Sequence, residues 1–381
     1  MASLHLFNPD NDIALARDVD NFTAPTAARD IRHAGSTLPM WYGTPGDRII
    51  ARGVSARWYD SVEKLFSTGI DVIGDSSPDT FIPSPWGWSK ASRRDFIRLG
   101  MAPALLPDDS TLDRLRMLSH RRTAISVVRC LEERLPFAIA TPAVEARDEK
   151  QIADFFDRNN AVIAKEPWSC SGRGIMDSRS VPPKRMAERM AAIIRNQGSV
   201  MLEHAYDKTC DFAVLINCSD GRAVFEGLSL FDTGANGDYH GNILDSNDRL
   251  ADRIAAHCDR GRLDALVDTL AGVIGREIAP RYNGPVGVDM ITTSGNGQPE
   301  FALVEINLRM TMGFVARRFH DRYMADGSTG RYSVTPRQTI VSPLPDAVTD
   351  SHRLVSGTVT LNPEGRFAFT AEVWSNDDFF V

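Results

Sequence analysis

Two carboxylates interrupt apolar segments in the stretch GPVGVDMITTSGNGQPEFALVEINLR, residues 284–309. Asp289 and Glu305 each stand between two apolar neighbours, and Asn307 and Arg309 follow at alternate positions. A carboxylate in such a setting loses hydration unless a cation compensates for the loss. Carboxylate and amide oxygens are the ligands that Mg²⁺ prefers, so Asp289, Glu305 and Asn307 are candidate ligands of a hard cation.

A β-hairpin is predicted to position these side chains. Residues 286–293 and 301–307 are apolar and rich in β-branched side chains, whereas 294–298 is typical of a turn. Alternate residues of a strand point to the same face, so Glu305 and Asn307 are expected on one face.

The length of the turn predicts the pairing of the two strands. A five-residue loop would pair Thr293 with Pro299 and place Asp289 opposite Leu303, diagonal to Glu305. The alternative is that both acids are solvated residues of an ordinary half-exposed hairpin.

A Ser/Gly-rich loop follows a predicted short strand at residues 161–165. Backbone amides of such a loop can close over phosphates, and Lys165 at the end of the strand can supply a positive charge to them. The segment has neither the GxxxxGK[ST] of a P-loop nor the GxGxxG of a dinucleotide-binding fold. Its loop residues are Ser169, Ser171, Gly172, Arg173 and Gly174.

Composition limits the class of protein. The chain has 381 residues, of which 43% are hydrophobic and 24% charged, so a globular protein of two or three domains is expected. A formal net charge of −7 without a basic block argues against nucleic acid as the main partner. Five widely spaced cysteines without a CxxC predict neither a disulfide framework nor a zinc site.

The N-terminal residues lack the pattern of a signal peptide, and no apolar stretch reaches 18 residues. We therefore expect a cytoplasmic protein without a membrane partner.

Short strands and helices are predicted to alternate in the first part of the chain, which favours a parallel α/β layer. Polar residues follow the first strand, where open α/β sheets commonly contact ligands, although helix capping explains them equally well. The segments are 4–7, 13–17, 47–51, 61–66 and 70–73, and the polar residues are Asn8, Asp10, Asn11 and Asp12.

Further along, apolar periodicity predicts one helix over 112–133 and others at 89–99, 149–159, 182–197, 262–278 and 313–324. Strands are predicted at 200–203, 211–217, 226–230, 354–361 and 367–373. Residues 231–247 are predicted to form a long polar loop, a candidate lid or substrate loop, which carries Asp232, Asp238, Tyr239, His240 and Asn242.

The order of these parts resembles the ATP-grasp superfamily. Over about residues 118–312 the chain has a basic residue, a strand lysine, a Ser/Gly loop, an acidic strand end, a later acid and a closing Glu-x-Asn-x-Arg. The EINLR segment and the strand lysine with SGRG are the most specific matches.

The resemblance implies an α/β chain with the ATP-grasp fold. An N-terminal parallel α/β domain at 1–117 would precede two lobes that enclose the nucleotide. These are a small lobe at 118–200 with the Ser/Gly loop, and a large lobe at 201–381 with the metal-binding hairpin.

The resemblance also implies roles for individual residues. ATP would bind with one or two Mg²⁺ ions, Mn²⁺ being the alternative, held by Asp289, Glu305 and Asn307. Lys165 would hold phosphate oxygens, and Arg309 would steady the transferred phosphate. The loop over the triphosphate would include Ser171, Gly172, Arg173 and Gly174, the adenine would meet Glu203, His204, Ala205 and Tyr206, and Asp211 would accept from the ribose.

Two positions depart from the family pattern. Arg122 is the candidate for the first basic residue, where members usually have lysine. Gly287 stands where many ligases have an arginine, two residues before the first metal carboxylate.

The leading functional hypothesis is an ATP-dependent carboxylate–amine ligase that acts on small-molecule or peptide substrates. A phosphotransferase with the same ATP site and a nucleotide-binding regulatory protein without turnover are the alternatives, and a homodimer is left open. Candidate substrate contacts are Asn8 to Asp12, Tyr239, His240, Asn242, and Arg317 or Arg318.

Overall fold

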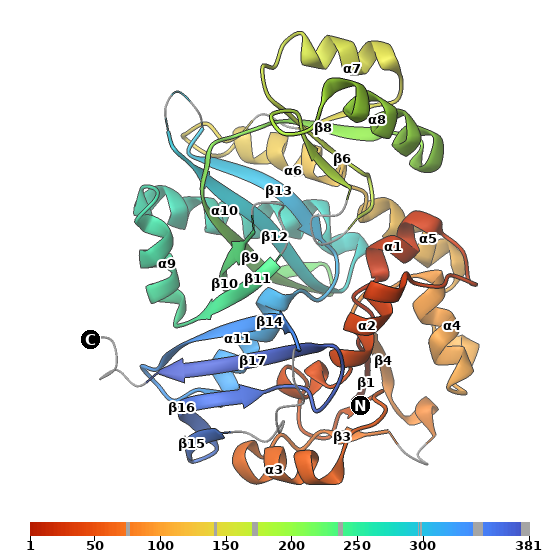
Figure 1. Ribbon diagram of the computed structural model, residues 1–381, viewed down its shortest axis with the longest axis vertical. Helices are drawn as coiled ribbons and strands as arrows, with labels where there is room; N and C mark the ends of the chain where they lie inside the picture. The colour runs from red at the N-terminus through yellow and green to blue at the C-terminus, as the bar shows by residue number, and fades with distance from the viewer. Residues whose placement is uncertain are drawn as a thin grey trace.

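The structure is a computed structural model with three β-sheets. In Figure 1 the N-terminal sheet lies at the lower right, beside the lower strands of the largest sheet, and the remaining sheet lies in the upper lobe. The structure describes residues 1–73, 77–140, 143–169, 174–234, 239–295, 297, 299–337 and 346–374. Within these ranges no helix has the length and apolarity needed to cross a lipid bilayer.

The N-terminal sheet is parallel, as predicted, with the strand order β3-β2-β1-β4. Its strands are β1 (Ser3–Leu6), β2 (Arg48–Ile49), β3 (Asp71–Val72) and β4 (Ile82–Pro85). Its helices are α1 (Asn11–Arg17), α2 (Thr26–Ala34), α3 (Ala56–Phe66), α4 (Lys90–Arg98) and α5 (Asp109–Leu118), with short 3₁₀-helices at Leu38–Trp41, Pro78–Thr80 and Pro103–Leu105.

A buried carboxylate joins β1 to the turn before β2. Asp47 accepts from the backbone N–H of Ser3 at 2.7 Å and of Thr44 at 2.8 Å, and its Oδ2 lies 3.0 Å from Nε2 of His5. Burial alone would raise the pKa of this carboxyl, but the hydrogen bonds from His5, Ser3 and Thr44 outweigh it and hold the pKa well below its usual range.

We expect the Asp47→Ala variant to be less stable by about 2–4 kcal/mol at pH 7, because charge-assisted hydrogen bonds are lost. Because the pKa of Asp47 is lower in the folded protein than in the unfolded chain, where it is about 3.9, the carboxylate stabilises the fold above that pH. This stabilisation is lost progressively as the pH falls from the unfolded pKa toward the folded pKa. Urea unfolding followed by tryptophan fluorescence at pH 7 and pH 3 measures both effects. A difference between wild type and variant that does not shrink at pH 3 would contradict this account.

The small sheet has the order β5-β8-β6-β7, in which all three pairs are antiparallel. Its strands are β5 (Val144–Ala146), β6 (Val162–Lys165), β7 (Ile175–Asp177) and β8 (Val200–His204), and its helices are α7 (Glu149–Phe156) and α8 (Pro183–Gln197).

The two faces of the small sheet differ in chemistry. One face carries Val162, Ala164, Val200 and Leu202, which are buried in an apolar cluster with methionines of α8. The register pairs Lys165 with Met201 and Ile163 with Glu203, so these four residues share the other face. Lys165 and Glu203 therefore point to the side away from the helices.

The third sheet has nine strands in the order β13-β12-β9-β10-β11-β14-β17-β16-β15. Its strands are β9 (Lys208–Ser219), β10 (Arg222–Thr233), β11 (Tyr239–Leu244), β12 (Gly284–Thr293), β13 (Phe301–Asn307), β14 (Thr329–Pro336), β15 (Asp346–Asp350), β16 (Arg353–Thr360) and β17 (Phe367–Trp374). Its helices are α6 (Thr123–Glu132), α9 (Asn247–Ala255), α10 (Arg260–Glu277) and α11 (Met312–Tyr323), with a 3₁₀-helix at Ala279–Arg281.

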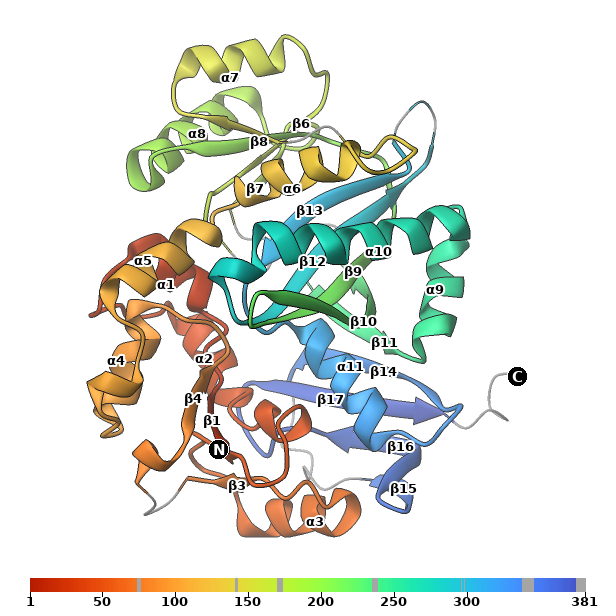
Figure 2. The same cartoon turned by 180° about the vertical axis from the view of Figure 1, so that it is seen from behind.

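Helices α6 and α10 cover one face of β12 and β13 (Figure 2). Val127 and Leu131 of α6 pack with Leu266 and Leu270 of α10 in the cluster that also contains Val288 of β12. The structure thus packs α6 with the nine-stranded sheet, whereas the predicted boundary at residue 118 assigns it to the small lobe. The domain limits themselves stay a prediction.

The prediction of one helix over 112–133 is wrong, because α5 ends at Leu118 and α6 begins at Thr123. Burial lowers the pKa of His120 to about 4, so its neutral ring can accept from the backbone N–H of Arg122 at 3.0 Å. The N–H of Arg121 donates instead to the Pro167 carbonyl at 3.2 Å. These contacts replace the helical hydrogen bonds of the predicted segment.

The prediction of a polar loop over 231–247 is also wrong, because β10 extends to Thr233 and β11 occupies Tyr239–Leu244. Asn242 is only 1% exposed, and its amide donates to Ser229 Oγ at 2.6 Å. Asp232, Tyr239 and Asn242 thus have polar partners within the sheet. Asp238 lies outside the described residues.

The predicted C-terminal hairpin is confirmed as β16 and β17, and it packs against the N-terminal region. Trp41 Nε1 donates to the Leu361 carbonyl at 2.9 Å, and the Phe7 and Phe369 rings meet edge to face with centroids 6.4 Å apart. Phe7, Trp41 and Phe369 belong to one buried apolar cluster.

Candidate active site

The metal-binding hairpin has a different register from the predicted one. Asp289 lies directly opposite Glu305, and Gly287 lies opposite Asn307. The register shifts between Asp289 and Met290, so Val304 is an extra residue on β13. Such a β-bulge moves the partner of Asp289 by one residue along β13. The pairs nearer the turn, such as Met290 with Leu303, already differ by one residue from the predicted register, so the predicted pairing of Asp289 with Leu303 is wrong.

The two carboxylates form a like-charged pair. Burial first and the charge of Glu305 second raise the pKa of Asp289 to about 7, against the opposing effects of Arg309, Asn307 and Arg121. Asn307 Nδ2 donates to Asp289 Oδ2 at 2.9 Å. Two adjacent carboxylates and an amide suit a hard divalent cation, which would relieve their repulsion.

Among the described residues, no three His, Cys, Asp or Glu side chains gather in a metal-binding arrangement. Protein ligands of a cation at this site would therefore be the two carboxylates and the amide oxygen, with other oxygens coming from a bound ligand. This donor set is the one that phosphate-bound Mg²⁺ commonly uses.

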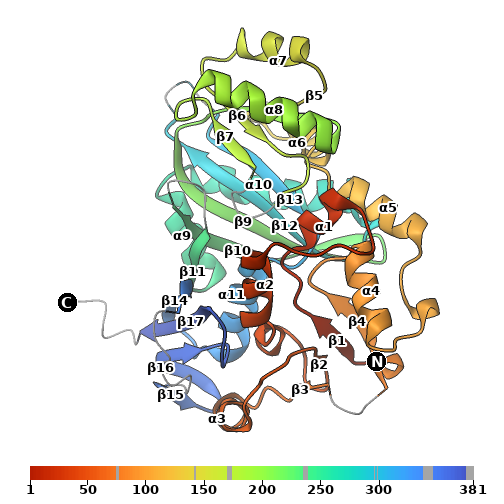
Figure 3. The same ribbon diagram turned by 45° about the vertical axis from the view of Figure 1, so that its right-hand side comes forward.

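Lys165 connects the small sheet to this hairpin. Its side chain is 4% exposed, and Nζ lies 2.6 Å from Glu203 Oε2 and donates to the Val304 carbonyl at 3.3 Å. The bulge residue thus supplies an acceptor to the predicted phosphate-binding lysine. In Figure 3, β6 and β7 lie directly over β12 and β13.

Arg121 is a site residue that the sequence did not predict. Its Nη2 lies 3.0 Å from Glu305 Oε1, and its Nε donates to the Glu166 carbonyl at 3.0 Å. The predicted residue, Arg122, points instead to Glu145, and its Nη1 is 3.7 Å from Oε2 of that carboxylate. The sequence contains two adjacent arginines, and only the irregular turn between α5 and α6 determines which one faces the carboxylates.

The ends of the Ser/Gly loop are described, whereas Ser171, Gly172 and Arg173 lie outside the described residues. Ser169 is buried and its Oγ accepts from Arg121 Nη2 at 3.1 Å. Gly174 has φ +70°, and a Cβ there would lie 2.6 Å from Glu166 Cδ. Only glycine suits this end of the loop.

The predicted adenine linker leads from β8 into β9. The Ala205 N–H donates to the Ala161 carbonyl at 3.0 Å, and the rings of His204 and Tyr206 meet edge to face at 4.8 Å. Asp211, the predicted ribose acceptor, accepts from Thr233 Oγ1 at 2.7 Å. The nucleotide roles of these residues stay predictions.

Arg309 pairs with the N-terminal domain. Its Nε and Nη2 lie 2.8 and 2.7 Å from Asp12 Oδ2, and both side chains are 13% exposed. Asp12 was predicted as a substrate contact, and here it holds the predicted catalytic arginine. Asn8 instead donates to the Gly87 carbonyl at 2.9 Å.

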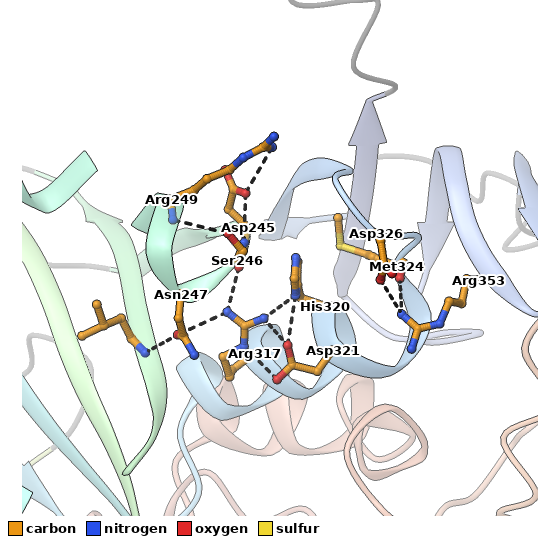
Figure 4. A network of polar contacts seen from close by, with 11 residues as sticks. Asp245, Ser246, Asn247, Arg249, Arg317, His320, Asp321, Met324, Asp326 and Arg353 are labelled. Atoms are coloured by element: carbon orange, nitrogen blue, oxygen red, sulfur yellow. Dashed lines mark hydrogen bonds and ion pairs between the residues drawn. The ribbon is translucent and has the colours of Figure 1, made fainter. Parts of the chain in front are cut away.

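Arg317 lies in a buried polar network between α9 and α11 (Figure 4). Its Nη1 donates to the Asp245 carbonyl at 2.7 Å, and its Nε donates to Asp321 at 2.9 Å. Arg318 contacts both carboxylate oxygens of Glu226 at 3.1 Å. These contacts hold Arg317 and Arg318 within the fold, and their role as substrate contacts stays a prediction.

The geometry also explains the missing arginine at position 287. A Cβ on Gly287 would lie 2.9 Å from Thr311 Cγ2, so the position has no room for a side chain. Arg121 brings a guanidinium to Glu305 from the turn between α5 and α6.

No family model and no curated protein matches the sequence. Two solved structures resemble the fold over 98% of this chain. One is the complex of biotin carboxylase from Campylobacter jejuni with beta-gamma-ATP, which matches with a TM-score of 0.52 and 12% identity over 88% of that chain. The other is the T882A variant of Rhizobium etli pyruvate carboxylase, with TM-score 0.53 and 13% identity, of which 36% is covered. The chain therefore has the fold of the ATP-grasp superfamily.

Proposed function

We propose that the protein is an ATP-dependent ligase that activates a carboxylate as an acyl phosphate for attack by an amine. The observation that carries the proposal is that cationic side chains from the small sheet and from the turn between α5 and α6 reach the hairpin that bears the two carboxylates. Asp289 and Glu305 lie opposite each other on the hairpin. Lys165 contacts the hairpin at the Val304 carbonyl, and Arg121 contacts Glu305. The likeness to the biotin carboxylase complex supports nucleotide binding between the small sheet and this hairpin.

In the proposed complex, Lys165 holds phosphate oxygens and the loop that ends at Gly174 covers them. The linker from Glu203 to Tyr206 contacts the adenine, and Asp211 accepts from the ribose. Arg121 takes the phosphate-binding role that the sequence assigns to Arg122, because its guanidinium faces the carboxylates.

Asp289, Glu305 and Asn307 would hold the cation. When bound, Mg²⁺ would neutralise phosphate charge that otherwise repels an incoming carboxylate. The protein side chains then position the reactants and exclude water.

The proposed reaction has two steps. A substrate carboxylate oxygen attacks the γ-phosphorus, the bond to the bridging oxygen of ADP breaks, and an acyl phosphate forms. The amine nitrogen then attacks the acyl carbon, phosphate leaves, and the amine loses a proton to solvent. Neither step needs a covalent nucleophile from the protein, and Arg309 would neutralise the transferred group.

The ion pair of Arg309 with Asp12 predicts that the N-terminal domain orients this arginine. We expect Asp12→Asn to lower the turnover rate by about 10- to 100-fold, because the guanidinium loses its charged partner. ATP affinity, measured by calorimetry, should stay close to that of wild type. A variant with unchanged turnover would contradict the positioning role.

A screen of carboxylate and amine pairs for ADP release tests the proposed function. The Asp289→Asn and Lys165→Ala variants are the controls, and equal ADP release from all three proteins would refute the site. ADP release with a phosphorylated small molecule and no condensed product would favour a phosphotransferase. ATP binding without turnover across the panel would favour a regulatory protein.

A further inference from the structure

Arg121 lies where the small lobe meets the candidate metal site. Its Nε donates to the Glu166 carbonyl and its Nη2 donates to Ser169 Oγ, at 3.0 and 3.1 Å. The same Nη2 lies 3.0 Å from Glu305 Oε1. With only 8% of the residue exposed, the guanidinium is held from one side while its charge faces a predicted metal ligand.

The other terminal nitrogen of Arg121 has a different environment. Nη1 is buried and has no hydrogen-bond partner among the described residues. A buried donor on a charged group is costly to leave unpaired, and phosphate oxygens are acceptors that a guanidinium binds well. Arg121 therefore keeps one donor for an anionic ligand while another is committed to Glu305.

A guanidinium and a divalent cation compete for the same carboxylate. With Arg121 in place, Glu305 is partly neutralised and a nearby Mg²⁺ is repelled. Without Arg121, Glu305 would directly face Asp289 and would lose the guanidinium that now lies 3.0 Å from it. The arginine thus reduces the electrostatic repulsion between the two carboxylates when no metal is bound.

On the basis of the proposed function, we infer that Arg121 is an internal counter-ion that exchanges partners. It holds Glu305 until nucleotide phosphates draw its guanidinium away, and the released carboxylate then accepts the cation. The protein consequently binds a divalent cation together with the nucleotide and only weakly without it.

Manganese binding tests this exchange without knowledge of the substrates. Electron paramagnetic resonance measures free Mn²⁺ in titrations of the full-length protein with and without ATP. Wild type should bind Mn²⁺ weakly alone and more tightly with ATP. Arg121→Gln should bind Mn²⁺ about 10-fold more tightly than wild type in the absence of ATP, within the range of ordinary coupling between sites.

The chain offers a matched control at the next residue. Arg122→Gln removes the same charge one position away, next to Glu145 rather than Glu305, and should leave the affinity for Mn²⁺ alone unchanged. Adding Glu305→Gln to Arg121→Gln should abolish the gain, which locates the site. Circular dichroism melting curves establish that each variant is folded.

The outcomes separate the exchange from the proposed function. If wild type binds Mn²⁺ with ATP but Arg121→Gln gains no affinity for Mn²⁺ alone, the exchange is refuted and the proposed function stands. Equal gains in Arg121→Gln and Arg122→Gln would also refute it, because a general change of charge would then be responsible. Failure of wild type to bind ATP under any of these conditions would refute the proposed function.

Discussion

Replacing Lys165 by methionine is expected to reduce ATP-dependent ADP release by about 100- to 1000-fold, the usual effect of removing one preorganised charge from an active site. The lysine is almost fully buried and lies between Glu203 and the Val304 carbonyl, so its ammonium is held in position before the nucleotide arrives. Methionine keeps most of the side-chain volume and removes only the charge. Coupled-enzyme assays of ADP formation measure the change.

Lys184 provides the control for this experiment, because it is an exposed lysine on α8 of the same lobe. Lys184→Met should retain the wild-type rate. Lys165→Met with a wild-type rate and a wild-type ATP affinity would show that the nucleotide does not bind at Lys165.

The Asp289→Asn variant is expected to lose activity to a similar extent, about 100-fold or more, because one of two charged cation ligands is removed. Its stability should behave in the opposite way. Asp289 directly faces Glu305, so a neutral amide relieves like-charge repulsion in the metal-free protein. We therefore expect a thermal midpoint equal to or above that of wild type.

Differential scanning fluorimetry with and without MgATP separates these effects. Wild type should gain thermal stability when MgATP is added, since a ligand that binds only the folded state stabilises it. Asp289→Asn should gain much less. Asp264→Asn, an exposed change on α10, serves as the control and should respond as wild type does. A full MgATP response in Asp289→Asn would exclude this carboxylate as a cation ligand.

Segments with strong local patterns were predicted well from the sequence. The ends of β13 and α8 agree within a residue of the predicted limits, because alternation, an early proline and a terminal glycine mark them locally. The convergence of Asp289, Glu305 and Asn307 was also predicted, since it depends only on a hairpin.

Details that depend on distant contacts were not predicted. The bulge at Val304 shifts the pairing by a single residue, and no local pattern marks it. The choice between Arg121 and Arg122 depends on the turn between α5 and α6, which a contact with Pro167 stabilises. The order of the nine strands likewise rests on long-range pairs such as Tyr332 with Ala371.

The apolar cluster that contains Phe7, Trp41 and Phe369 has a consequence for biosynthesis. The first strand leaves the ribosome long before β17 exists, and Trp41 then lacks the backbone carbonyl of Leu361 that accepts its indole proton. Domains that complete themselves early fold during translation, in order of emergence. Here the apolar side chains of the amino-terminal portion stay without these partners until residues 361–369 have been synthesised.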